Sequence, residues 1–341
     1  MAMESTKQSE IYLITGASGF IGFHLSKRLL ESGCQVIGID NMNDYYDVDL
    51  KYARLDELKP YKSFTFIEED ISNKEQLMVI FSEYKPDVVV NLAAQAGVRY
   101  SIENPDVYIK SNMIGFYNVL EACRHYPVDH LIYASSSSVY GANKKVPFVE
   151  TDFVDNPVSL YASTKKSNEL MAHTYSHLYD IPATGLRFFT VYGPMGRPDM
   201  AYFSFTDKFF AGESIKIFNN GDFENDLYRD FTYIDDIVEG IERLIPNAPT
   251  EHVKHKVFNI GNNTPQKLMT FIHALEKALS NSLDREIEFK KEYEPIKPGD
   301  VPATYASTDA LQKAVGFKPK TTIQDGLKQF MDWYVQYYNK N

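Results

Sequence analysis

A tyrosine and a lysine four positions apart, Tyr161 and Lys165, are the residues of this sequence best suited to proton transfer. They lie near the start of a segment, 160–180, whose apolar spacing predicts a helix, and residues i and i+4 share one helix face. The pKa of a free phenol is about 10, and a neighbouring ammonium lowers it by stabilising the phenolate. The pair is therefore a candidate proton shuttle, although the same spacing also occurs on solvated helices.

A run of four serines, 135–138, follows a strand predicted at 130–134. Its hydroxyl groups emerge at the carboxyl end of that strand, where parallel sheets bind ligands. One interpretation is a serine-rich turn, and the other is a set of donors to a substrate hydroxyl or carbonyl.

A glycine-rich turn, Gly16, Gly19 and Gly22, lies between a predicted strand and a predicted helix. Such a turn lets the backbone and a helix N-terminus approach a pyrophosphate. Asp40 ends the second predicted strand 18 residues after Gly22, near the offset at which a carboxylate accepts the adenosine ribose hydroxyls. Because positions 41–43 hold no Lys or Arg to neutralise a 2′-phosphate, the sequence predicts NAD rather than NADP. Asp70, after the third strand, suits either the adenine edge or the N-cap of the next helix.

These residues require a framework of alternating strands and helices, and the apolar pattern predicts one. Expected strands at 11–15, 35–39, 64–67, 88–92, 130–134 and 183–188 alternate with helices that include 74–85, 105–125 and 160–180. This order predicts an α/β fold with a Rossmann-like, doubly wound parallel sheet. Beyond about Thr190 the rhythm changes, with helices expected at 268–281 and 322–340, which predicts a smaller mixed α/β substrate-binding domain. We expect 10–188, with a return segment at about 230–262, to bind the dinucleotide, and 189–229 with 263–341 to bind the substrate.

The composition excludes several other classes of protein. The chain has 341 residues, of which 44% are hydrophobic and 24% charged, with a net charge of −11. This balance argues against nucleic-acid binding. No apolar run suits a membrane span and no signal peptide is evident, so we expect no membrane association and a cytoplasmic location. His173 and His177 share a helix face without the acidic residue of a metalloprotease motif, so no metal site is expected.

Taken together, the glycine turn, the serine run and the Tyr161/Lys165 pair resemble the extended short-chain dehydrogenase/reductase family. Four further segments are similar to the UDP-glucuronate 4-epimerases of that family: 40–47 (DNMNDYYD), 93–101 (AAQAGVRYS), 188–194 (FFTVYGP) and 196–200 (GRPDM). Segments 229–236 (RDFTYIDD) and 298–302 (PGDVP) fit its nucleotide-sugar part. The resemblance covers nearly the whole chain.

The resemblance implies a reversible C4 epimerisation of UDP-glucuronate to UDP-galacturonate through a 4-keto intermediate, with resident NAD and a helix-bundle homodimer. It makes Ser136 the catalytic hydroxyl, Tyr161 the base and Lys165 its partner. The implied cofactor contacts are Gly16, Gly19, Phe20, Ile21, Gly22, Asp40, Asn41, Asn43, Asp70, Ile71, Leu92, Ala93, Ala94, Gln95, Tyr161 and Lys165. The implied substrate contacts are Arg99, Ser136, Ser137, Ser138, Thr190, Arg197, Ile217, Phe218, Arg229, Lys297 and Asp300. The chain departs from the family at Lys297, where Arg or Gln is common, and over 221–228, which is longer than usual.

Four alternatives remain open at this point. A UDP-glucuronate decarboxylase begins with the same oxidation at C4 and differs in how the carboxylate is held. A 4-epimerase of a neutral UDP-hexose, such as UDP-glucose or UDP-N-acetylglucosamine, shares the whole mechanism. Sugar 4,6-dehydratases resemble the chain less, because they place an Asp-Glu pair where Ser137 and Ser138 stand. A non-catalytic NAD-sensing protein would usually have lost Tyr161 or Lys165.

Overall fold

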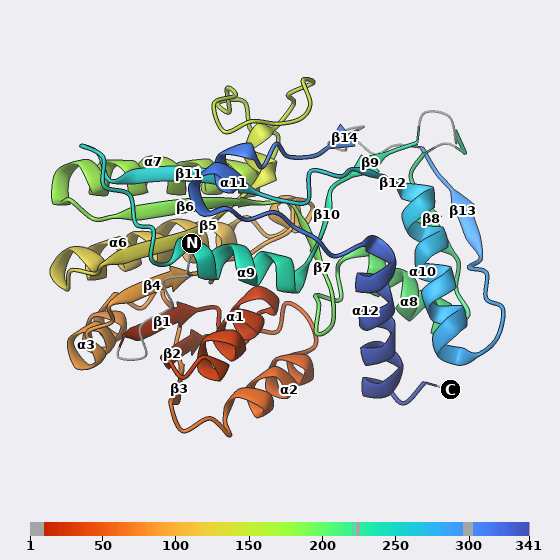
Figure 1. Cartoon of the computed structure of the whole chain (residues 1–341), viewed down its shortest axis with the longest axis horizontal. Coiled ribbons are helices and arrows are strands. Elements are labelled where there is room, and N and C mark those ends of the chain that lie inside the picture. The colour runs from red at the N-terminus through yellow and green to blue at the C-terminus, as the bar shows by residue number, and fades with distance from the viewer. Residues whose placement is uncertain (1–9, 220, 223–225, 296–302, 341) are drawn as a thin grey trace.

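A seven-stranded sheet forms the centre of the protein (Figure 1). The computed structural model describes residues 10–219, 221–222, 226–295 and 303–340. All strands of the sheet run parallel, in the order β11-β6-β5-β4-β1-β2-β3. Their bounds are β1 Ile11–Thr15, β2 Gln35–Asp40, β3 Phe64–Glu68, β4 Val88–Asn91, β5 His130–Ser136, β6 Ala183–Phe188 and β11 His255–Ile260. The predicted doubly wound sheet is confirmed, and its order reverses between β1 and β4, where such sheets bind ligands.

Helices cover both faces of this sheet. α1 (Phe20–Glu31), α2 (Val48–Leu58) and α9 (Ile234–Leu244) pack on one face, and α3 (Lys74–Tyr84), α6 (Phe116–His125) and α7 (Leu160–Tyr179) on the other. Successive residues of β1 alternate between the two layers: Tyr12 and Ile14 lie in the first core and Leu13 in the second. Because both faces are covered, most of these strands are rich in apolar residues, which is why six of the seven were predictable. β11, which begins with His255 and Lys256, was not among the predicted strands.

The helix predicted over 105–125 is interrupted by a π-helical turn. α4 (Tyr100–Glu103) and α5 (Asp106–Tyr108) precede the π-helix η1 (Ile109–Gly115), which leads directly into α6. Gly115 lies against Ile71, where a Cβ atom would come within 2.7 Å of the Ile71 side chain. The π turn brings Ser111 and Asn112 to the dinucleotide side of the sheet, and such turns are frequent at functional sites.

The second part of the chain builds small sheets and a helical layer, drawn to the right of the sheet in Figure 1. Its pairs are β7 (Thr190–Tyr192) with β10 (Phe231–Tyr233), and β8 (Ile215–Ile217) with β13 (Lys291–Tyr293). β9 (Tyr228–Arg229) joins β12 (Gln266–Lys267) and β14 (Ala303–Thr304). Helices α8 (Ala201–Phe210) and α12 (Ile323–Tyr337) pack through aromatic side chains such as Phe203, Phe330 and Tyr334, and α10 (Leu268–Leu283) packs on α12. α11 (Asp309–Val315) returns to contact β11.

None of the helices within the described ranges is both long enough and apolar enough to span a membrane.

Buried His130, at the start of β5, makes the stability of this fold sensitive to acid. Its ring nitrogens contact Ile245 O at 3.0 Å and Thr184 Oγ1 at 2.8 Å, and burial lowers its pKa from 6.5 to about 4. The unfolded chain therefore binds the proton more readily, so stability falls as the pH drops from about 6.5 to about 4. We expect His130 to account for a loss of about 2 kcal/mol in the free energy of unfolding between about pH 7.5 and about pH 5.

Urea unfolding of the wild type and of His130→Asn at the two pH values measures this contribution. The variant should lose less stability on acidification than the wild type, although it starts from a lower value. Equal losses in the two proteins would show that His130 does not titrate in this range.

Candidate active site

The glycine-rich turn joins β1 to α1 at the switch point of the sheet. A Cβ atom on Gly22 would lie 2.1 Å from the carbonyl oxygen of Gly16, and one on Gly16 would lie 2.8 Å from the amide nitrogen of Ala93. These two glycines are therefore required by the turn itself. α1 begins at Gly19 with no described side chain capping it and no acidic residue in its first turn. Its first N–H groups and its positive dipole end face the pocket, which fits a pyrophosphate.

Asp40 ends β2 beside this turn, as predicted, and the structure adds a cation that the sequence analysis missed. The buried Asp40 carboxylate accepts hydrogen bonds from the amides of Ser18, at 3.1 Å, and Met42, at 3.0 Å. The buried ammonium of Lys51, from α2, lies 3.5 Å from it and lines the same pocket. The sequence prediction rested on positions 41–43 only and did not reach this cation. The preference for NAD must rest on Asp40 itself, whose charge opposes a 2′-phosphate.

Asp70 lies at the same end of the pocket, after β3. Asn73, and not Asp70, caps α3, so the N-cap interpretation of Asp70 is wrong. The Asp70 carboxylate instead accepts from the Ser72 amide at 2.9 Å, pairs with Lys110 Nζ at 3.0 Å and receives a bond from Asn41. It lines the pocket beside Ile71.

The floor of the pocket is the segment after β4, which includes Leu92, Ala93, Ala94 and Gln95. The Asn112 side chain fixes the position of this segment. Its carboxamide oxygen accepts a hydrogen bond from the backbone N–H of Gln95 at 2.8 Å, and its NH2 group donates to the backbone carbonyl oxygen of Gln95 at 2.9 Å. The NH2 group of Asn112 also donates to Thr164 Oγ1 at 3.1 Å. One residue of the π turn thus connects the floor to helix α7.

Ser136, Tyr161 and Lys165 all line this pocket, at the end of β5 and in the first turns of α7. Ser159 caps α7 by accepting from the Ala162 amide at 3.1 Å, which fixes the start of the helix two residues before Tyr161. A hydrogen bond joins the Tyr161 hydroxyl to Ser136. The buried Lys165 ammonium donates to the carbonyl oxygen of Ala134 at 2.9 Å.

Burial dominates the electrostatics of this trio. It raises the pKa of the Tyr161 phenol above 10, and the Ser136 hydrogen bond and the Arg197 charge act in the opposite direction. Burial lowers the pKa of Lys165 to about 8. Arg197 is thus a cation near the phenol that the sequence spacing did not indicate, and the effect of Lys165 on the phenol stays a prediction.

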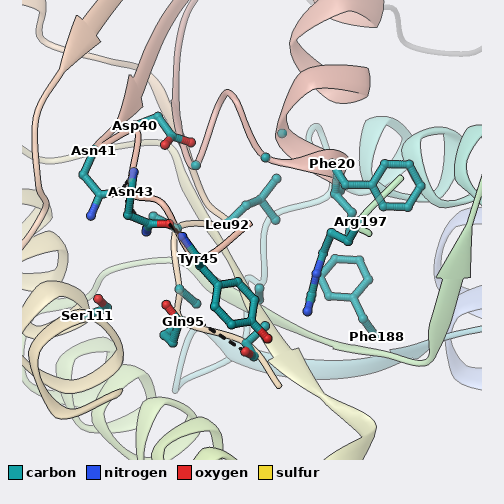
Figure 2. A pocket seen from close by; sticks show the side chains of 18 of the residues that line it. Phe20, Asp40, Asn41, Asn43, Tyr45, Leu92, Gln95, Ser111, Phe188 and Arg197 are labelled. Atoms are coloured by element: carbon teal, nitrogen blue, oxygen red, sulfur yellow. Dashed lines mark hydrogen bonds between the residues drawn. The ribbon is translucent and has the colours of Figure 1, made fainter. Parts of the chain in front are cut away.

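Arg197 enters the pocket from the loop between β7 and α8 (Figure 2). Its guanidinium forms a two-bond ion pair with Asp199, with Nε at 3.0 Å from Oδ1. Burial alone would lower the pKa of Arg197, but the Asp199 carboxylate raises it above its ordinary value, so the group stays charged. Gly196 is required beside it, because a Cβ atom there would lie 1.9 Å from the Tyr202 hydroxyl.

Buried Arg54, from α2, fixes this loop against the dinucleotide turn. It donates to the carbonyl oxygens of Met195, at 2.7 Å, and Gly196, at 3.1 Å, and also to that of Ser18, at 2.8 Å. The loop that carries Arg197 and the turn that carries the glycines are therefore held by one side chain.

All the predicted cofactor contacts line one pocket, whereas the predicted substrate contacts are dispersed. The lining residues among the predicted contacts are Gly16, Gly19, Phe20, Ile21, Gly22, Asp40, Asn41, Asn43, Asp70, Ile71, Leu92, Ala93, Ala94, Gln95, Ser136, Tyr161, Lys165 and Arg197. Ser137 and Ser138 begin the short helix η2 (Ser137–Tyr140), and Thr190 begins β7. The Arg99 guanidinium lies 5.4 Å from the centre of the Phe218 ring, and Arg229 lies in β9. Lys297 and Asp300 lie outside the described residues.

Ile217 does not fit its place among the implied substrate contacts, where it and Phe218 would pack against the uracil ring. Its side chain is fully buried in the hydrophobic core of the second part, so it offers no surface to a base, whereas Phe218 is only half-buried.

The pocket also contains residues that the sequence analysis did not select. They come from the loop after β2, α2, the residue after β3, the π turn, the end of β6 and the start of the second part. The main ones are Tyr45, Tyr46, Lys51, Glu69, Ser111, Phe188, Phe189, Val191 and Met200. Among the described residues, His, Cys, Asp and Glu side chains form no group of three placed to hold a metal ion.

Known proteins resemble this chain along nearly its whole length. Protein CapI of Staphylococcus aureus is 53% identical, over 96% of this chain and 99% of that protein. A probable UDP-glucuronate 4-epimerase of Rhizobium meliloti is 44% identical, over 96% of this chain and 98% of that protein. The crystal structure of UDP-glucuronic acid 4-epimerase from Bacillus cereus, in complex with UDP-glucuronic acid and NAD, superposes with a TM-score of 0.86. It is 34% identical and the match covers 96% of this chain and 100% of that one.

These matches confirm the resemblance that the sequence motifs indicated. Residues 13–330 also match the protein family described as GDP-mannose 4,6 dehydratase. The chain belongs to that family.

Proposed function

We propose that this protein is an NAD-dependent UDP-sugar 4-epimerase that interconverts UDP-glucuronate and UDP-galacturonate. The observation that carries the proposal is the convergence of Ser136, Tyr161 and Lys165 on the pocket that the glycine turn and Asp40 also line. The Bacillus cereus and Rhizobium relatives support the choice of substrate and cofactor.

In the proposed mechanism Tyr161 removes the proton of the C4 hydroxyl and later returns it. Ser136, which is hydrogen-bonded to the phenol in the structure, would turn its single O–H to the sugar's O4 and stabilise the charge that develops there. Lys165, buried beside them, anchors the trio through the Ala134 carbonyl and would hold the nicotinamide ribose of bound NAD. NAD, when bound, takes the hydride from C4 and returns it, and its positively charged ring favours the phenolate. After oxidation the 4-keto sugar turns about its nucleotide anchor and presents its other face, so the net redox change is zero.

The carboxylate of glucuronate needs control, because a 4-ketone makes it a β-keto acid that loses CO2 when the C5–C6 bond aligns with the carbonyl π system. We assign the grip on this carboxylate to Arg197, with the hydroxyl groups of Ser137, Ser138 and Thr190 as further donors. Arg197 is charged and lines the pocket, and charge-assisted bonds to a carboxylate are the strongest that these side chains offer.

A dehydratase fits this pocket less well, although the family takes its description from one. Loss of water across C5–C6 needs an acid and a base beside the sugar. The carboxylates among the described lining residues are Asp40, Glu69 and Asp70, which all lie where the adenosine of the dinucleotide is expected. Ser137 and Ser138 cannot replace a carboxylic acid in that step.

For the nucleotide end we propose that 189–229 and 263–341 hold the UDP group, while 10–188 with 230–262 hold NAD. Arg99 and Phe218, which lie against each other, are the proposed contacts to the diphosphate and the base. Arg229 and Lys297 stay proposed diphosphate contacts, and Asp300 a proposed substrate contact, on the basis of the sequence motifs alone.

We further propose that the protein works in the cytoplasm as a homodimer. Exposed apolar side chains follow one another along α4, η1, α6 and α7: Ile102, Ile109, Ile114, Tyr117, Leu170 and Leu178. Such a row is typical of an interface. Sedimentation of the purified protein, beside a Leu170→Glu variant, tests this point: the wild type should sediment as a dimer and the variant should dissociate.

The function is tested by incubating the protein as purified with UDP-glucuronate and no added cofactor, and resolving the products by NMR. UDP-galacturonate as the product supports the proposal. A UDP-pentose with release of CO2 identifies a decarboxylase instead, and conversion of UDP-glucose but not UDP-glucuronate identifies a neutral-sugar epimerase. NAD extracted from the same preparation should account for the activity.

A further inference from the structure

Arg197, Asp199 and Tyr45 form a cluster at the edge of the pocket. Asp199 binds two donors of the guanidinium, and its second oxygen also lies 3.3 Å from the Tyr45 hydroxyl. Tyr45 comes from the loop after β2 and packs on Tyr100, with ring centres 4.8 Å apart. Figure 2 shows Tyr45 and Arg197 reaching into the pocket from different segments.

The ion pair is incompletely buried, with 24% of the Arg197 side chain and 33% of the Asp199 side chain exposed. Because Asp199 already pairs with Arg197, a sugar carboxylate that approaches the guanidinium finds its positive charge already neutralised. Two carboxylates beside one guanidinium repel each other, so the substrate carboxylate can bind Arg197 tightly only if Asp199 moves away from the guanidinium.

We propose that Asp199 is a positioning residue that competes with the sugar carboxylate for Arg197 and so allows that carboxylate to be released when the sugar ring turns. This inference rests on the proposed function. Because the two faces of the sugar must be presented in succession, the carboxylate has to leave its first position in every cycle. When the sugar carboxylate leaves, Asp199 pairs with the guanidinium again. This lowers the free-energy cost of breaking the contact between Arg197 and the sugar carboxylate.

Tyr45 makes the exchange possible without leaving Asp199 unpartnered. When the substrate occupies Arg197, the Asp199 carboxylate keeps the hydrogen bond from the Tyr45 hydroxyl. Loss of that hydroxyl should therefore matter more in the complex than in the unoccupied enzyme, where Arg197 still pairs with Asp199.

The test compares Asp199→Asn with the wild type, using the holoenzyme, and measures binding of UDP-glucuronate and of neutral UDP-glucose by calorimetry. Asp199→Asn should bind UDP-glucuronate about three- to tenfold more tightly, as expected for removal of a partly exposed charge from a two-bond pair. Binding of UDP-glucose should be unchanged. The kcat with UDP-glucuronate should fall, because release becomes slower. An unchanged ratio of the two affinities, or an unchanged kcat, overturns the proposal.

Two matched variants complete the design. Asp199→Glu keeps the charge and should restore the wild-type affinity ratio. Tyr45→Phe keeps the ring, and should weaken UDP-glucuronate binding about two- to threefold; tighter binding in this variant would contradict the exchange. The affinity ratio is measured whether or not the sugar is turned over, so failure of the wild type to epimerise UDP-glucuronate counts against the proposed function alone.

Discussion

Replacing Tyr161 by phenylalanine is expected to lower turnover of UDP-glucuronate by about 10⁴-fold, the upper end of the range for loss of a proton-transfer group. The ring of Tyr161 packs edge-on against Tyr108, with ring centres 6.1 Å apart, and phenylalanine can keep that contact. The variant loses only the hydroxyl that is hydrogen-bonded to Ser136. Cofactor retention should be unaffected, because the glycine turn, Asp40 and Lys165 are unchanged.

Turnover is measured by NMR and cofactor content by extraction from the purified variant. Because burial raises the pKa of the Tyr161 phenol, the wild-type rate should also rise with pH, and that rise should be absent from the residual rate of Tyr161→Phe. Ser136→Ala is the matched comparison. Its turnover should fall by less, about 10²–10³-fold, as expected for loss of one hydrogen-bond donor to a developing oxyanion. Activity of Tyr161→Phe near the wild-type level would refute the assignment of Tyr161 as the base.

The parts of this site that were predictable from the sequence depend on local patterns. The apolar strands and the glycine turn place Gly16, Asp40 and Ser136 at one edge of a parallel sheet, whatever the later details of packing. Helical spacing then places Tyr161 and Lys165 on one face of α7. All five residues line the same pocket.

What the sequence could not provide depends on contacts between distant segments. Lys51 reaches Asp40 because α2, which the apolar pattern did not predict, folds back across the end of β2. The pKa of the Tyr161 phenol responds to burial, to the Ser136 hydrogen bond and to Arg197, which is 36 positions away in the sequence. Ile217 and Phe218 are adjacent in the sequence, yet only the register of β8 decides which of them enters the core.

The buried ion pair behind the active site was invisible in the sequence for the same reason. Glu169, one turn after Lys165 on α7, binds Arg187 of β6 through both of its oxygens, each at 2.8 Å. Ser135, the neighbour of Ser136, donates to the same carboxylate at 2.7 Å. The pair thus connects the catalytic helix to the strand ends that carry the serine run.

Glu169→Ala should lower the free energy of unfolding by about 3–5 kcal/mol, because it leaves the Arg187 charge buried without its carboxylate. Arg187 is 3% exposed, and its other hydrogen-bond partners, the Tyr140 hydroxyl and the Glu150 carbonyl oxygen, are neutral. The carboxylates of Glu150 and Asp152 act on it only through space. Urea unfolding measures the loss at neutral pH. The matched control is the double variant Glu169→Met with Arg187→Met, which removes both charges and fills similar volume, so it should be markedly more stable than Glu169→Ala alone. If the double variant were the less stable of the two, the cost would come from lost packing and polar contacts, and an unpaired charge would not explain it.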